Sequence, residues 1–530
     1  MTKKAKSSKT LCIIIWIIFL FVQIPGPALC DEGKEIQILV TSDIHGWLST
    51  SLINPTRKRS GLLHIESIIR KARQSNPNLL LVDGGDLLQG SPLVHYFNHV
   101  TDSISENPFF QVFQHLQYDA VVVGNHDLAI NPLLEKAYLP KSNFSWLAAN
   151  VYRNKQPVFT PYKIIKRSGV KIAILGFTTP GSLMWNDFEK SDTLTISSIS
   201  ESLHHWLDVL KKTEKPAIII VIFHAGLDPF RDDENSKFKR ISSTNVSKSM
   251  LEEIEGIDLV IVGHNHRLNP TRKNRKINYI GRTPVVQAGR WAEAVLDVRL
   301  QWKGRQVRKP LNIVVNVLPA LQNKKIDEKY KDIISEDYKK YLFAPLPLFF
   351  KNAPKQKLTS CINILNALAQ YDTKIDGTML PKIKIYRKSD VVHDRLQRID
   401  LFRWIKYDNR SVIIRVNSKQ IFLLNSPKPE YGKRRIKSNR VLFPWFKNGF
   451  QQKKMNYGML DKDQFIKNKL IKISNYHNNG GGGIVPQLFI NQTEVLEKSN
   501  EFLRDNLYEY LKSCEHPWPK ECYFLQHQCK

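Results

Sequence analysis

Short apolar runs alternate with amphipathic segments along the N-terminal half of the chain. Runs of Val, Ile and Leu, such as IQILV, NLLLV and IIIVIF, each end in polar residues. Between them, the apolar positions of residues 62–73, 108–117, 199–211 and 246–255 recur with helical spacing. Continuous apolar runs of this kind are typical of strands in a sheet that is covered on both faces. The pattern therefore predicts an α/β domain.

The alternation stops between about residues 323 and 357, where a charged helical segment and the Pro-rich run APLPLFFKNAP predict an interdomain linker. Beyond it lie short mixed elements and a helix near residues 500–512. A chain of 530 residues is also too long for one ordinary domain. We expect an N-terminal α/β domain over residues 31–322, a linker over 323–357, a smaller α/β domain over 358–512 and a cysteine-containing tail over 513–530.

The first thirty residues have the pattern of a signal peptide. Four lysines precede an apolar run over residues 11–24, and PGPALC follows with small residues before a cut after Cys30. A retained N-terminal anchor is the weaker alternative, because a spanning helix needs about 20 apolar residues. Residues 1–30 are therefore expected to be removed, and the protein to be exported to a periplasm or secreted.

Cleavage after Cys30 leaves an even number of cysteines, namely Cys361, Cys514, Cys522 and Cys529. An even count is compatible with disulfides in an oxidising compartment. Three of the four lie in the C-terminal tail, without the paired close spacing of a metal site. A tail held by disulfides is the favoured interpretation.

The formal net charge of +30 is spread along the chain. Basic clusters occur at residues 272–276 and 433–437, but neither has the interleaved aromatic residues that stack on bases. We therefore expect no sequence-specific binding of nucleic acid. The charge indicates either a solvated basic surface or attraction to anionic substrates or an anionic membrane.

Polar side chains with metal-binding chemistry follow five of the predicted strands. Because ligands bind at the carboxyl ends of strands in open α/β sheets, these residues are expected to converge. Mixed imidazole and carboxylate ligands fit Mn, Fe or Zn better than Ca or Mg. Two such ions about 3.5 to 4 Å apart can share a hydroxide nucleophile and hold phosphoryl oxygens. The candidate residues are Asp43, His45, Asp86, Asn125, His126, His224, His264 and His266.

Each of these residues taken alone has an ordinary structural explanation. Asp86 could cap a helix, Asn125 could hold a turn, and His224 could pack in a core. Their joint occurrence at successive strand ends favours a site with two divalent metal ions. Five other histidines lie outside the strand-end loops and are expected to be surface or packing residues: His64, His95, His99, His204 and His205.

The five segments resemble the calcineurin-like metallophosphoesterase family, whose signature runs D-x-H, G-D, G-N-H-D/E, H and G-H-x-H. The resemblance implies a four-layer α/β sandwich and metal-dependent phosphoester hydrolysis. It implies that Asn125 and His126 are catalytic, with His126 beside the phosphate to protonate the leaving oxygen. It also implies one metal on Asp43, His45 and His266, another on Asn125, His224 and His264, and Asp86 between them.

The sequence departs from this family at Ala129, where some relatives place an Asp that orients the catalytic histidine. A partner for His126 is therefore expected from elsewhere in the chain. Asp127 is adjacent in sequence, but its side chain can point away.

A narrower resemblance is to the 5′-nucleotidase and 2′,3′-cyclic-nucleotide 2′-phosphodiesterase (3′-nucleotidase) branch. It is carried by GDLLQGSP and GFTTPGSLMW, and more weakly by SCINILNALAQ, FRWIKYDN, MNYGML and SNYHNNGGGG. The branch implies a nucleotide substrate whose base is sandwiched by Tyr457 and Tyr476. No clear NGG-x-R element precedes FRWIKYDN, and His477 stands where an Arg is expected.

The resemblance thus predicts hydrolysis of 2′,3′-cyclic nucleotides and 3′-nucleotides by a metal-bridging hydroxide, with His126 assisting the leaving group. The first alternative is a 5′-nucleotidase or another small phosphoester hydrolase that uses the same site. The second is an exported binding protein that keeps the fold without turnover.

Overall fold

The computed structural model describes residues 34–51, 60–101, 104–131, 133–185, 194–228, 246–302 and 312–349, and shorter segments between residues 362 and 527. The predicted signal peptide, the four cysteines, Tyr457 and Tyr476 lie outside the described residues. Among the helices that are described, none has the length and apolar character needed to cross a membrane.

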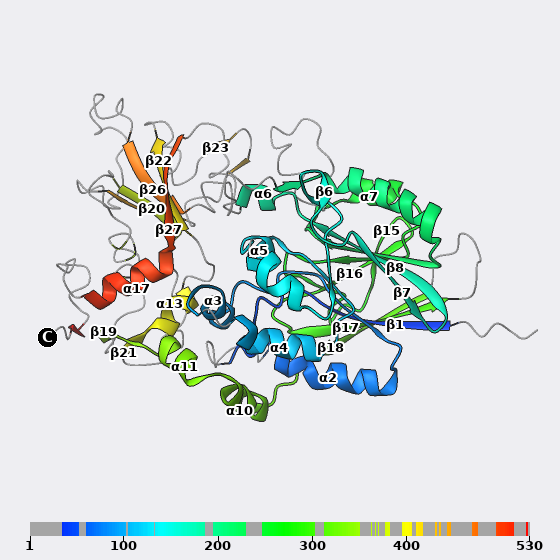
Figure 1. The fold of residues 1–530 in the computed structure, drawn as a ribbon, viewed down its shortest axis with the longest axis horizontal. Helices are drawn as coiled ribbons and strands as arrows, with labels where there is room; N and C mark the ends of the chain where they lie inside the picture. Colours follow the sequence, from blue (N-terminus) through cyan, green and yellow to red (C-terminus); the bar gives the residue numbers. More distant parts are fainter. Residues whose placement is uncertain are drawn as a thin grey trace, which may run out of the picture.

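Two mixed sheets form the centre of the N-terminal domain (Figure 1). The first has six strands in the order β18-β17-β1-β2-β3-β4, and β1 to β4 run parallel. Its strands are β1 (Lys34–Thr41), β2 (Leu80–Asp83), β3 (Ala120–Val122), β4 (Ser145–Leu147), β17 (Ala294–Trp302) and β18 (Asn312–Pro319).

The second sheet has seven strands, with the order β14-β16-β13-β10-β8-β7 and β15 paired to β16. Four of them, β8, β10, β13 and β16, run parallel. The strands are β7 (Tyr162–Arg167), β8 (Val170–Thr178), β10 (Ile218–His224), β13 (Leu259–Val262), β14 (Leu268–Asn269), β15 (Asn278–Ile280) and β16 (Thr283–Ala288).

Alternate residues of the parallel strands face two different cores. In β1, Ile38 and Val40 pack between the two sheets, whereas Leu39 packs against the helices on the outer face. The outer helices of the first sheet are α2 (Leu62–Ser75), α3 (Pro92–His99) and α4 (Pro108–His115); those of the second are α7 (Ile199–Val209) and α9 (Lys248–Glu253). The result is a four-layer α/β sandwich, which confirms the expected fold class (Figure 1).

The helices begin where the sequence provides capping side chains. Ser91, Asn107 and Ser198 each accept a hydrogen bond from a backbone N–H in the first turn of α3, α4 and α7. Pro92 and Pro108 occupy the first helical position, where a missing N–H costs nothing. These local signals explain why the helices expected from periodicity occur close to their predicted positions.

The segment expected to be a linker forms α10 (Lys324–Ile333), α11 (Glu336–Leu342) and β19 (Pro345–Phe349). Tyr330, Tyr338 and Leu342 of the two helices are buried in the same core as α2 and α3. Beyond them, a five-stranded sheet has the order β25-β20-β26-β22-β27. Its strands are β20 (Gly377–Pro381), β22 (Arg410–Val416), β25 (Leu442–Phe446), β26 (Lys469–Ser474) and β27 (Glu494–Phe502).

The C-terminal helix α17 (Leu503–Ser513) contacts α3 of the N-terminal domain. Arg504 is only 2% exposed; its guanidinium lies 3.1 Å from His95 Nδ1 and 3.6 Å from the ring centroid of Phe402 in α13 (Arg398–Trp404). Asp505 lies 3.5 Å from His95 Nε2 on the other side of the imidazole. A buried, partnered histidine therefore joins residues more than 400 positions apart.

Arg504→Ala is expected to lower the free energy of unfolding by about 2 kcal/mol or more, because it removes a buried contact to His95 and a cation–π contact to Phe402. Urea denaturation measures this loss, and limited proteolysis reports release of α17. Lys512→Ala, on an exposed position of the same helix, should change the free energy by no more than about 0.5 kcal/mol. Equal effects of the two substitutions would contradict a docking role for Arg504.

Candidate functional site

Six of the seven predicted metal-binding side chains lie just beyond the carboxyl ends of β1, β2, β3 and β13. The seventh, His224, is the last residue of β10. Five of them have left-handed backbone conformations, with φ between 52° and 72°: Asp43, His45, Asp86, His264 and His266. Non-glycine residues rarely adopt this conformation, and such strain clusters at binding and catalytic sites. The turns thus direct these side chains toward a common centre rather than along the strands.

The first group contains Asp43, His45, Asp86 and His266, whose ligand atoms all lie within 4.8 Å of one another. The Nε2 atoms of His45 and His266 are 3.0 Å apart, and Asp43 Oδ1 lies 3.4 Å from His266 Nε2. Asp86 Oδ2 lies 3.8 Å from His45 Nε2. Three of the four residues are buried, and His266 is 18% exposed, so one side of the group is open to solvent.

The second group contains Asp86, His224 and His264. The same Asp86 Oδ2 atom lies 3.2 Å from His224 Nε2 and is therefore common to both groups. Asn125 Oδ1 completes this group, at 3.2 Å from His224 Nε2 and 2.9 Å from His264 Nδ1. The structure thus brings together all seven residues predicted from the sequence, with Asp86 in the shared position.

Backbone carbonyl groups orient two of the imidazoles. His45 Nδ1 lies 2.7 Å from Gln89 O, and His224 Nδ1 lies 2.7 Å from Gly84 O. Because a carbonyl oxygen can only accept, Nδ1 donates in each contact, so Nε2 is the ring atom that would bind a metal once each ring is neutral. The backbone after β3 passes close to the Asp86 side chain, and this requires glycine at position 124. A Cβ at Gly124 would lie only 2.1 Å from Asp86 Oδ1.

Asp127 holds the loops that carry Asp86 and Asn125. Its Oδ1 accepts hydrogen bonds from the backbone N–H groups of Leu87 and Leu88, both at 2.8 Å, and its Oδ2 accepts from those of Asp86 and Gly124, both at 2.9 Å. The side chain is fully buried and faces the backbone of the neighbouring loop. Asp127 therefore fixes loop geometry and leaves the orientation of His126 to another residue.

Gln89 supplies a partner for His126 that the sequence did not identify. His126 Nδ1 forms a short hydrogen bond with Gln89 Oε1, and the backbone N–H of His126 donates to Asp86 Oδ1 at 2.9 Å. The amide oxygen of Gln89 acts where some relatives would use the Asp that Ala129 replaces. Gln89 lies within the GDLLQGSP motif, so the signal was present, but only the fold shows that its side chain reaches His126.

Burial and mutual charge shift the pKa values of these side chains. Burial lowers the pKa of His45 to about 4 and those of His264 and His266 to about 3, so these rings are neutral at pH 7. Burial raises the pKa of Asp43 to about 8. For His224, the charges of Asp86 and Asp43 outweigh burial and raise the pKa to about 10. Neutral imidazoles beside buried carboxylates form a donor set that fits transition-metal cations, which would replace the protons on Asp43 and His224.

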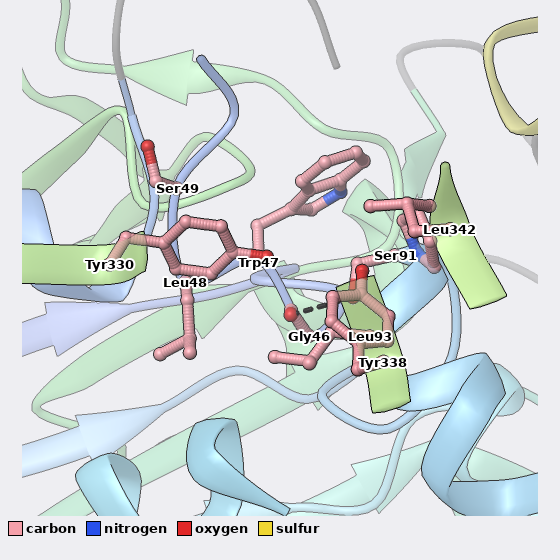
Figure 2. Close-up of a pocket in the computed structure, with 10 residues that line it drawn as sticks. Gly46, Trp47, Leu48, Ser49, Ser91, Leu93, Tyr330, Tyr338 and Leu342 are labelled. Carbon is pink, nitrogen blue, oxygen red and sulfur yellow. Dashed lines mark hydrogen bonds between the residues drawn. The ribbon is translucent and has the colours of Figure 1, made fainter. Parts of the chain in front are cut away.

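A small pocket adjoins the loop that carries His45 (Figure 2). Gly46 and Trp47 line it from that loop, and Tyr330 and Tyr338 line it from α10 and α11. Ser91 Oγ, at the start of α3, donates a hydrogen bond to Gly46 O over 2.7 Å. None of the predicted metal ligands lines this pocket. It marks where the two helices pack behind the first loop of the site.

The five histidines expected outside the site belong to neither group of potential ligands. His64, for example, is buried between Leu321 O, 2.6 Å from Nδ1, and Asp327 Oδ1, 3.1 Å from Nε2. It joins α2 to α10. His95 packs against α17, and His204 and His205 are exposed on α7.

Comparisons with known proteins agree with this fold. Residues 36–268 match the family model of the calcineurin-like phosphoesterases. A 2′,3′-cyclic-nucleotide 2′-phosphodiesterase/3′-nucleotidase of Yersinia enterocolitica is 28% identical over 335 residues, covering 57% of this chain and 49% of that protein. A 5′-nucleotidase of Vibrio cholerae is 26% identical over 314 residues, covering 56% of this chain and 54% of that protein. The chain spans about half the length of these curated relatives.

The structural likeness extends further along the chain. A Staphylococcus aureus structure assigned as a 5′-nucleotidase, in complex with alpha-ketoglutarate, has a TM-score of 0.69 at 19% identity. The match covers 92% of this chain and 98% of that one, and at this identity it shows a shared fold. The four-layer fold and the clustered Asp, Asn and His side chains define a domain with a candidate metal centre. Residues 36–268 of this domain are similar to the calcineurin-like phosphoesterases.

The arrangement predicts how metal content responds to substitution. Protein loaded with Mn and dialysed should retain about two ions per chain, because two adjoining groups of ligands are present. Asp86→Ala should lose both ions, whereas His266→Ala and His264→Ala should each lose one. Elemental analysis measures the content, with His115→Ala, an exposed histidine on α4, as the control. Full metal content in Asp86→Ala would show that this carboxylate is not shared.

Proposed function

We propose that the protein is a metal-dependent phosphoester hydrolase that acts on nucleotides, and that its substrates are 2′,3′-cyclic nucleotides and 3′-nucleotides. The observation that carries this proposal is the position of Asp86, whose Oδ2 atom faces both groups of potential ligands. The similarity to a 2′,3′-cyclic-nucleotide 2′-phosphodiesterase/3′-nucleotidase supports the choice of substrate.

In this proposal, Asp43, His45 and His266 hold one cation, Asn125, His224 and His264 hold the other, and Asp86 is shared. The donor set of imidazole, carboxylate and amide oxygen suits Mn, Zn and Fe. Two such cations supply Lewis-acid activation of the ester and of the attacking water. The protein's contribution is to fix both sets of ligands in one largely buried cluster that is partly exposed at His266.

His126 is proposed to protonate the leaving oxygen. Its Nδ1 bond to Gln89 and its N–H bond to Asp86 fix the ring beside the shared carboxylate. With Nδ1 engaged in this hydrogen bond, Nε2 is the ring atom proposed to meet substrate. A positioned imidazole of this kind contributes about 10²- to 10⁴-fold in rate.

The remaining parts of the proposal rest on sequence. Tyr457 and Tyr476 would sandwich the base, and residues 1–30 would direct export to a periplasm or secretion, where the four cysteines would pair. A sandwich of aromatic rings suits several nucleotides because every base has a π-face.

A substrate panel on Mn-reconstituted protein tests the activity. Release of phosphate from 3′-AMP, and of 3′-AMP from 2′,3′-cyclic AMP, is expected, and His126→Ala should reduce kcat by about 100-fold or more. A strong preference for 5′-AMP would instead favour a 5′-nucleotidase, the activity named for the Vibrio cholerae relative. If metal-loaded protein hydrolyses no phosphoester, the result favours the alternative of a binding protein without catalytic activity.

Substitution of Gln89 tests how His126 is oriented. Gln89→Ala should lower kcat by about 10- to 100-fold, because the imidazole loses an acceptor that fixes its ring. The loss should be larger for esters with poor leaving groups, such as nucleotides, than for p-nitrophenyl phosphate, whose leaving group needs no proton. Gln89→Glu keeps an acceptor oxygen and should recover most of the rate.

Metal content separates this effect from damage to the centre. His45 is held by the backbone carbonyl of Gln89, which Gln89→Ala retains. If Gln89→Ala keeps its metal content but loses kcat equally for nucleotides and for p-nitrophenyl phosphate, Gln89 does not act through His126.

A further inference from the structure

The loop over residues 289–293 follows a sixth strand at the edge of the sheets where the predicted ligands gather. It connects β16 of the second sheet, which runs parallel to β13, with β17 of the first sheet, which pairs with β1. The loop therefore crosses from one sheet to the other beside the ends of β1 and β13. These are the strands that precede Asp43 and His266.

Two backbone hydrogen bonds fix this loop to the metal-binding groups. The N–H of Gly289 donates to Arg267 O at 2.9 Å, and the N–H of Trp291 donates to Asp43 O at 2.8 Å. Arg267 directly follows His266 in sequence. Arg290, which lies between the two donors, is thus held beside the first group of potential ligands, whose member His266 is partly exposed.

The backbone of the loop is strained. Trp291 and Ala292 are adjacent non-glycine residues with φ of 54° and 49°, both in the left-handed region. Such residues are uncommon and persist where the surrounding structure determines them. No predicted metal ligand lies in this loop. Its strained conformation therefore has a role other than binding a metal directly.

The Arg290 side chain is oriented by an aromatic ring and not by an acidic side chain. Its guanidinium lies 4.3 Å from the ring centroid of Trp291, and that ring contacts Trp47 at 6.0 Å between centroids. Within the part of the chain that the structure describes, the guanidinium forms no hydrogen bond and no ion pair.

We propose that Arg290 recognises the phosphate of the substrate, by donating hydrogen bonds to phosphoryl oxygens on the His266 side of the centre. A guanidinium presents a planar fork of donors that matches phosphate, and stacking on Trp291 orients that fork in advance. Three features of the structure support the assignment: the loop anchored on both sides of Arg290, a guanidinium without a counter-ion among the described residues, and the partial exposure of His266. The inference deepens the proposed function and rests on it for the identity of the ligand.

Binding of inorganic phosphate to Mn-loaded protein, measured by titration calorimetry, tests this inference without turnover. Arg290→Ala should weaken phosphate binding by about 10- to 100-fold, as expected for a charge-assisted contact. Arg290→Lys should lie between wild type and Arg290→Ala, because a lysine keeps the charge but not the fork. The matched control is Arg282→Ala, an exposed arginine at the other end of β16, which should bind phosphate as wild type does.

The outcomes separate this inference from the proposed function. Loss of phosphate affinity in Arg290→Ala but not in Arg282→Ala supports it, even if no nucleotide in the panel is hydrolysed. Nucleotide hydrolysis together with equal phosphate affinity in both variants overturns it and leaves the proposed function intact. Absence of phosphate binding to metal-loaded wild type also overturns it. So does loss of metal from both Arg290 variants, since Arg290 would then support the centre itself.

Discussion

The geometry of the site depends on the hydrogen bonds that the carboxylate of Asp127 accepts. This buried carboxylate accepts hydrogen bonds from four backbone N–H groups. They belong to the two loops that follow β2 and β3. Hydrogen bonds to a charged acceptor contribute about 1.5 to 3 kcal/mol each, and a buried N–H without a partner is costly. The two loops therefore cannot move apart, and Asp86 and Asn125 keep their places as a unit.

This constraint allows the protein to concentrate charge that would otherwise repel. Asp43 and Asp86 are buried beside His45 and His224, in the space between the ends of two sheets. Burial raises the pKa of Asp43, whereas neighbouring imidazoles hold the pKa of Asp86 well below its usual value although burial opposes them. Divalent cations would offset this carboxylate charge more completely, with the neighbouring imidazoles as further ligands.

Two residues connect this centre to what surrounds it. Gln89 contributes its backbone to His45 and its side chain to His126, so a single residue orients a candidate metal ligand and the proposed acid. It lies just before α3, against which α17 packs through His95 and Arg504. The C-terminal helix thus docks on the helix that begins next to Gln89.

The sequence by itself predicted the helices α2, α4, α7 and α9, strands such as β1, β2 and β10, and the identities of the side chains that gather at the candidate site. Those features are local: apolar periodicity and capping residues define the elements, and short motifs at strand ends supply the ligands. The tertiary structure decided which atoms meet. Asp127 faces the backbone of another loop, Gln89 reaches His126 from a different motif, and Arg290 lies beside His266 because its loop is bonded on both sides. These contacts join segments far apart in the chain, so no spacing along the sequence could specify them.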